Sequence, residues 1–280
     1  MRLARIVALL IGVLTAAALR AEAPSHKFMT ASDGVKIHYM ELGRGTPVVL
    51  IHGYTANSEG KWFKSGIAQA LAAKHRVIAI DARGHGQSDK PHDPLKYGPR
   101  MANDVVELMD HLKIQKAHVH GYSMGGSILA QVLATHPDRL ITAIFGGSGV
   151  QESDPAWQAR VPKDPEPPAA DAPNAPRGEN WAGYPGYDRA ALDAVQKYPW
   201  KPEERTNDLT KVQIPVLALV GSLDRPNQRT HRMQREVKHF TLVVLPGETH
   251  GSAHLNPKYT QTLVAFIAAN DRGAEGGRPF

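Results

Sequence analysis

The chain has 280 residues, of which 42% are hydrophobic, with a formal net charge of +6 and no cysteine. This length and composition suit one α/β domain with a sizeable core and an insertion. The lack of cysteine excludes disulfides and thiolate catalysis. No stretch combines clustered Lys and Arg with aromatic residues as a nucleic-acid groove would, so we expect no nucleic-acid partner.

The first 23 residues have the form of a secretory signal peptide. A short basic start precedes an uninterrupted apolar run over residues 6–19, and the small residues Ala21 and Ala23 follow. The run is short for a membrane span, so we expect a secreted or periplasmic protein with no stable span after cleavage. The alternative is an uncleaved N-terminal anchor, because Pro24 hinders cleavage after Ala23.

The next segments predict the edge of a sheet and its first buried strand. Residues 26–31 and 35–42 flank the turn Ser32-Asp33-Gly34, which predicts an edge hairpin. The apolar run at residues 48–51 is typical of a strand buried on both faces of a parallel sheet. It leads into His52-Gly53-Tyr54, where the backbone N–H of Tyr54 is a candidate oxyanion donor. The alternative reading is an ordinary strand-to-loop turn.

Hydrophobic periodicity predicts alternating strands and helices along the rest of the chain. The expected elements are a helix at 62–74, a strand at 75–80, a helix at 100–112, strands at 140–145, 214–221 and 240–245, and a helix at 257–269.

A charged cluster follows the strand at 75–80. It contains Asp81, Arg83, His85 and Asp89, which could suggest metal or acid–base chemistry. Glycine and charge after a strand more often build a tight loop held by internal hydrogen bonds, and we favour that structural role.

The clearest catalytic pattern surrounds Ser123. A short strand at 117–120 runs into Gly121-Tyr122-Ser123-Met124-Gly125, and an apolar helical pattern follows. This is the G-x-S-x-G spacing of a nucleophilic serine at a sharp strand-to-helix turn, where glycine lets the chain pack closely. The N–H of Met124, at the helix N-terminus, is the expected second oxyanion donor. The alternative is a glycine-rich turn whose serine only caps the helix.

The composition changes between residues 154 and 208, where prolines are frequent and apolar periodicity is weak. We interpret residues 154–210 as a lid insertion between two core segments, 24–153 and 211–270. The tail at 271–280 is expected to be disordered.

Two further polar residues follow later strands. Asp224 and His250 stand, like Ser123, just after a predicted strand, and the chain order is Ser, acid, His. Because the carboxyl ends of parallel strands share one edge of a sheet, we expect these three side chains to converge. His254 is the rival base, further past the end of its strand.

Taken together, the motifs resemble the α/β-hydrolase fold family over residues 27–269. The segments that carry the resemblance are Leu50-Ile51-His52-Gly53, Asp81-Ala82-Arg83-Gly84-His85-Gly86-Gln87-Ser88, His120-Gly121-Tyr122-Ser123-Met124-Gly125-Gly126, Val220-Gly221-Ser222-Leu223-Asp224 and Pro246-Gly247-Glu248-Thr249-His250. The resemblance implies a mostly parallel eight-stranded sheet with helices on both faces, a Pro-rich lid after the sixth strand, and no metal or organic cofactor. A serine nucleophile argues against the family's dehalogenases and epoxide hydrolases, which use aspartate there.

We therefore predict a serine hydrolase that cleaves small-molecule carboxylic esters through an acyl-enzyme intermediate. Ser123 attacks, His250 transfers the proton and Asp224 orients His250. The alternatives are acyltransferase, perhydrolase or haloperoxidase-like, or peptidase-like activity at the same triad, and a ligand-binding protein without turnover. The sequence carries no signal for the oligomeric state.

Overall fold

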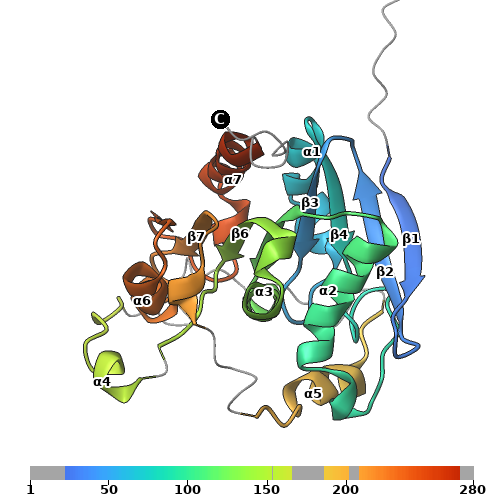
Figure 1. The fold of residues 1–280 in the computed structure, drawn as a ribbon, viewed down its shortest axis with the longest axis horizontal. Helices are drawn as coiled ribbons and strands as arrows, with labels where there is room; N and C mark the ends of the chain where they lie inside the picture. Colours follow the sequence, from blue (N-terminus) through green and yellow to red (C-terminus); the bar gives the residue numbers. More distant parts are fainter. Residues whose placement is uncertain (1–22, 153, 166–185, 202–207, 272–280) are drawn as a thin grey trace, which may run out of the picture.

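The computed structural model describes residues 23–152, 154–165, 186–201 and 208–271 (Figure 1). The expected signal peptide lies outside these ranges except for its last residue, as do much of the expected lid and the tail after residue 271. Those assignments stay predictions. Within the described ranges, no helix has both the length and the apolar character needed to cross a membrane.

The centre of the molecule is an eight-stranded sheet in the order β1-β2-β4-β3-β5-β6-β7-β8 (Figure 1). The strands are β1 (Ser25–Thr30), β2 (Lys36–Leu42), β3 (Thr46–Ile51), β4 (His75–Ile80), β5 (Ala117–Tyr122), β6 (Leu140–Gly146), β7 (Val216–Gly221) and β8 (Phe240–Leu245). β2 pairs antiparallel with β1 and with β4, and all other pairs are parallel. The expected mostly parallel sheet with an edge hairpin is therefore confirmed.

Helices cover both faces of this sheet. They are α1 (Ile67–Ala72), α2 (Pro99–His111), α3 (Met124–Thr135), α4 (Pro155–Gln158), α5 (Arg189–Gln196), α6 (Pro226–Glu236) and α7 (Pro257–Asn270). Shorter turns of helix are η1 (Glu59–Phe63), η2 (Pro94–Lys96), η3 (Pro137–Arg139), η6 (Leu209–Lys211) and η7 (Ala253–Leu255).

Side-chain alternation along the strands divides the core into two layers. In β3, Val49 and Ile51 point to the cluster formed with α2, α3 and α6, whereas Val48 and Leu50 point to the cluster formed with α1 and α7. Because both sides of the central strands are buried, β3 and β7 are largely continuous apolar runs, whereas β5 also buries His118 and His120. Because β3, β5, β6, β7 and β8 pair in parallel, the carboxyl ends of β3, β5, β7 and β8 lie at one edge of the sheet.

Two parts of the predicted helix pattern were wrong. The helix expected at 62–74 is a π-helix, η1, followed by α1, because Gly66 adopts φ 81° between them and breaks the helical backbone. Helix α6 was missed altogether. Its sequence is strongly polar and buries only Pro226, Thr230 and Met233, so too few apolar residues mark its buried face.

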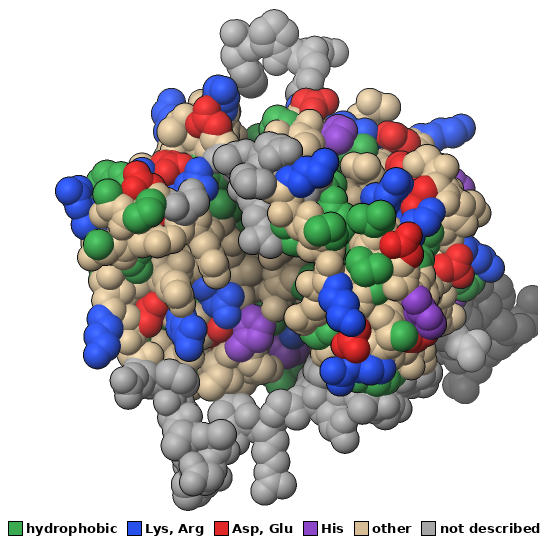
Figure 2. Space-filling model, turned by 90° about the horizontal axis from the view of Figure 1, so that it is seen from below, with side chains coloured by type: hydrophobic (Ala, Val, Ile, Leu, Met, Phe, Trp, Pro, Cys, Tyr) green, Lys and Arg blue, Asp and Glu red, His purple; other side chains and the backbone are tan. Residues whose placement is uncertain are grey.

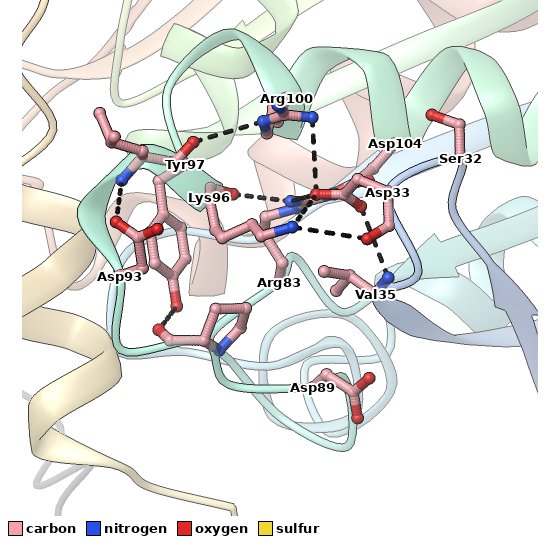
Figure 3. Close-up of polar contacts among 12 residues, drawn as sticks. Ser32, Asp33, Val35, Arg83, Asp89, Asp93, Lys96, Tyr97, Arg100 and Asp104 are labelled. Atoms are coloured by element: carbon pink, nitrogen blue, oxygen red, sulfur yellow. Dashed lines mark hydrogen bonds and ion pairs between the residues drawn. The ribbon is translucent and has the colours of Figure 1, made fainter.

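The charged residues after β4 are held by hydrogen bonds within the protein, in agreement with the structural interpretation, and Figure 3 shows those of Arg83. Arg83 is 1% exposed and binds the carboxylate of Asp104 at 2.6 and 2.7 Å and that of Asp33 at 2.9 and 3.1 Å. The Arg83 hydrogen bonds lower the pKa of Asp33 to about 2. Burial raises the pKa of Asp104 to about 6 despite the same guanidinium. Asp81 accepts the backbone N–H of Ser58 in a neighbouring loop and that of Gln87 in its own loop.

Candidate active site

Ser123 occupies a strained turn between β5 and α3. Its backbone angles are φ 54° and ψ −115°, a conformation that side-chain-bearing residues rarely adopt. A Cβ at Gly121 would lie 2.1 Å from the carbonyl oxygen of Gly125, and a Cβ at Gly125 would lie 2.2 Å from that of Ile51. The glycine spacing is therefore a steric requirement of this turn.

The structure brings Ser123, His250 and Asp224 together in one hydrogen-bonded chain. Ser123 Oγ lies 2.8 Å from His250 Nε2, and His250 Nδ1 lies 2.8 Å from Asp224 Oδ2. A carboxylate can only accept, so Nδ1 carries the proton and Nε2 is free to accept the Ser123 hydroxyl proton. The Asp224 side chain is 3% exposed, whereas that of His250 is 43% exposed and faces solvent.

Both candidate oxyanion donors belong to the turns beside Ser123. Across the described ranges, the backbone N–H groups of Tyr54 and Met124 have no hydrogen-bond acceptor. A Cβ at Gly53 would lie 3.2 Å from Ser123 Cβ, so the loop that contains Tyr54 passes directly over the serine. Two free amides beside the serine are the arrangement that stabilises an oxyanion.

His52 fixes the start of that loop. Its Nε2 accepts the N–H of Ala82 at 3.1 Å, and its Nδ1 donates to the carbonyl of Gly53 at 2.7 Å. Burial lowers the pKa of His52, in keeping with the neutral tautomer that these two bonds require.

Two residues that sequence analysis missed hold the triad in place. In α6, Arg229 donates from Nε and Nη2 to Asp224 Oδ1 at 3.1 and 2.8 Å, and from Nε to the Asp224 carbonyl at 2.8 Å. The Tyr122 hydroxyl donates to the carbonyl oxygen of His250 at 2.6 Å. Neither contact has a local sequence signal, because α6 has few apolar residues to mark it as a helix and Tyr122 lies 128 residues from its partner.

The rival base His254 is directed elsewhere. It is 2% exposed, and its Nδ1 lies 3.0 Å from Nζ of Lys61, which also lies 3.7 Å from the centre of the Tyr122 ring. Burial, with the Lys61 charge in addition, lowers the pKa of His254 to about 3. The geometry places His250, and not His254, against Ser123.

A cavity of about 490 Å³ opens above the serine and includes Ser123, Met124, Trp200 and Arg229 in its wall. A second cavity of about 550 Å³ adjoins it, because Gln151 and Glu152 line both. Figure 2 views the molecule from the side on which α5 lies in Figure 1, and this face is hollowed near its centre. In the described ranges, no group of three or more His, Asp or Glu side chains is arranged to hold a metal ion.

The fold and this geometry are those of an α/β hydrolase, and the comparison with protein families agrees. The alpha/beta hydrolase fold family matches residues 46–208, more than half of the chain, so the protein belongs to this family. It is similar to the non-heme haloperoxidase of Rhodococcus erythropolis, at 26% identity over 86% of this chain and 98% of the relative.

Two further similar proteins differ in the share of their length that this chain covers. The dihydrolipoyllysine-residue acetyltransferase component of the acetoin cleaving system of Pseudomonas putida is 38% identical over 43% of this chain, which spans 32% of that longer protein. The solved structure of an N-acyl homoserine lactone degrading enzyme superposes with a TM-score of 0.66 at 26% identity, covering 87% of this chain and 100% of that one.

Proposed function

We propose that the protein is a serine hydrolase that cleaves carboxylic esters. The observation that carries the proposal is the continuous chain from Ser123 through His250 to Asp224, with both contacts at 2.8 Å, beside two backbone amides free to bind an oxyanion. Each part of this arrangement has a defined role in acyl transfer.

The reaction has two halves. Ser123 Oγ attacks the ester carbonyl while His250 Nε2 accepts its proton, and the N–H groups of Tyr54 and Met124 stabilise the tetrahedral oxyanion. The alcohol leaves with the proton from His250, and the acyl group stays on Ser123. Water then attacks the acyl-enzyme and gives a proton to His250, which returns it to Ser123 Oγ as the bond to the acyl group breaks and the acid leaves. Asp224 accepts from His250 Nδ1 throughout and stabilises the imidazolium.

A second candidate is perhydrolysis, in which hydrogen peroxide replaces water in the second half and the acyl group leaves as a peracid. The similarity to a non-heme haloperoxidase favours this candidate over other acyl acceptors. Transfer to alcohols or amines, peptide cleavage and binding without turnover would use the same cavity, and they are the other outcomes of the test.

The test is hydrolysis of 4-nitrophenyl esters with acyl chains from two to twelve carbons, comparing the purified protein with Ser123→Ala. We expect Ser123-dependent activity, with a loss of at least about a thousandfold in the variant. An optimum at short chains would define a carboxylesterase, and one at long chains a lipase-like enzyme. Equal inactivity of both proteins would contradict ester hydrolysis. Added hydrogen peroxide, with detection of peracid, tests the second candidate.

We also propose export from the cytoplasm, on the basis of the N-terminal sequence pattern. N-terminal sequencing of protein from fractionated cells tests it. A soluble form starting between residues 19 and 24 is expected, and membrane-bound protein that starts at Met1 would favour the uncleaved anchor.

A further inference from the structure

The two adjoining cavities have an unbalanced set of charges. Their walls contain the carboxylates of Glu152 and Asp164, and both are already bonded. Glu152 pairs with Arg235 at 2.5 Å, and Asp164 accepts the backbone N–H groups of Asn227 and Gln228 at 2.7 and 2.9 Å. The charge of Glu152 is therefore balanced by Arg235, and the charge of Asp164 is partly offset by the N-terminus of α6.

Arg232, in the first cavity, pairs with Glu236 at 3.0 Å, whereas two other guanidinium groups in these walls have capacity left. Arg225, in the second cavity, is exposed, and its side chain has no hydrogen bond or ion pair in the described part of the chain. Arg229 shares the first cavity with Ser123 and uses Nε and Nη2 to hold Asp224, while its Nη1 has no acceptor within those ranges. Lys and Arg side chains gather beside the hollow in Figure 2.

Arg225 is also strained. It adopts φ 51° and ψ 55°, a left-handed conformation, although the next residue is Pro226. Residues with a Cβ disfavour this region, and a following proline biases its neighbour toward extended angles. Strain of this kind persists where surrounding structure enforces it, and it is frequent at functional sites. Here it falls on the residue that follows the triad acid.

We propose that the two cavities together recognise an ester whose acyl group carries a carboxylate, with Arg225 and Nη1 of Arg229 as its partners. This inference rests on the proposed function. A guanidinium fork matches the two oxygens of a carboxylate, and Arg is suited to such partly buried pairs. The acyl group stays on Ser123 after the alcohol leaves. A positive group in the two cavities would therefore bind the carboxylate of the acyl group in both halves of the reaction.

A matched pair of substrates isolates the charge. Mono-4-nitrophenyl glutarate and its methyl ester have the same leaving group and five-carbon diacid, and differ only in the free carboxylate. We expect kcat/KM at least about tenfold higher for the anionic ester, the size of discrimination that a paired polar contact supplies. The preference should shrink as NaCl is raised, because salt screens exposed charges.

Variants assign the preference to the site. In Arg225→Gln the anionic-to-neutral ratio should fall about tenfold, whereas Arg225→Lys should retain most of it. Lys238→Gln is the control, since it removes the same charge from an exposed position just beyond α6 and outside both cavities. If Arg225→Gln fails to fold, the wild-type protein is tested for inhibition by free glutarate and by neutral glutaramide. Stronger inhibition by glutarate would support the carboxylate site, and equal inhibition would overturn it.

The outcomes separate the two proposals. Ser123-dependent turnover of the neutral ester with no preference for the anionic one would overturn the carboxylate inference and leave ester hydrolysis standing, as would a ratio unchanged in Arg225→Gln. If neither ester is turned over, ester hydrolysis falls, and calorimetric titration with glutarate then decides. Binding weakened about tenfold in Arg225→Gln would support the carboxylate site, and no binding would overturn it.

Discussion

Replacing Arg229 with Gln tests how far the triad depends on the guanidinium behind Asp224. The substitution removes a positive charge and hydrogen bonds of 2.8 and 3.1 Å to Oδ1. Because the Asp224 side chain is 3% exposed, water cannot easily replace them. A hydrogen bond to a charged group contributes about 1.5–3 kcal/mol. At about 1.4 kcal/mol per factor of ten, its loss should lower kcat/KM by about 10–100-fold.

The assay is hydrolysis of 4-nitrophenyl acetate at one fixed pH, with Arg229→Lys as the variant that keeps the charge. Lys should recover part of the rate. A Gln variant with wild-type kcat/KM would refute the reasoning, because Asp224 would then need no partner except His250.

Three further substitutions have defined outcomes. Gly121→Ala places a Cβ 2.1 Å from a backbone carbonyl oxygen of the same turn, so it should lower the melting temperature and abolish activity, both measured on purified protein. Tyr122→Phe removes the 2.6 Å hydrogen bond to the carbonyl of His250. It should lower the free energy of unfolding by about 1–3 kcal/mol and reduce kcat. An unchanged kcat would show that other contacts hold His250. Arg83→Met leaves Asp104 buried without its cation and should lower stability in urea by about 3–5 kcal/mol at pH 8. Burial already raises the pKa of Asp104 to about 6, above its unfolded value, so its ionisation lowers stability as pH rises through 6. The loss of stability in the variant should therefore be smaller at pH 5 than at pH 8. A loss that is independent of pH would contradict this account.

The sequence allowed prediction of the features that depend on local sterics and strand periodicity. Glycine at positions 121 and 125 follows from close contacts with backbone carbonyl groups, and the apolar runs that become β3 and β7 mark where polar residues emerge at one sheet edge. These two signals are enough to bring Ser123 and Asp224 to the same edge.

What could not be predicted depends on long-range packing. Arg229 lies on α6, whose sequence contains few apolar residues, and its contact with Asp224 exists only once that helix packs beside β7. The break at Gly66 was missed because buried Trp62 and Phe63 continue the apolar pattern through η1. Residues that face cavities, such as Arg225, need not follow any periodicity.

The most direct test of the central claim is labelling with a fluorophosphonate, which reacts with a serine activated by its neighbours. The triad predicts a single modification per chain, located by mass spectrometry on the peptide that contains Ser123, and absent from Ser123→Ala and from His250→Ala. Folded wild-type protein that stays unlabelled, or label that persists in Ser123→Ala, would contradict the assignment of Ser123 as the nucleophile.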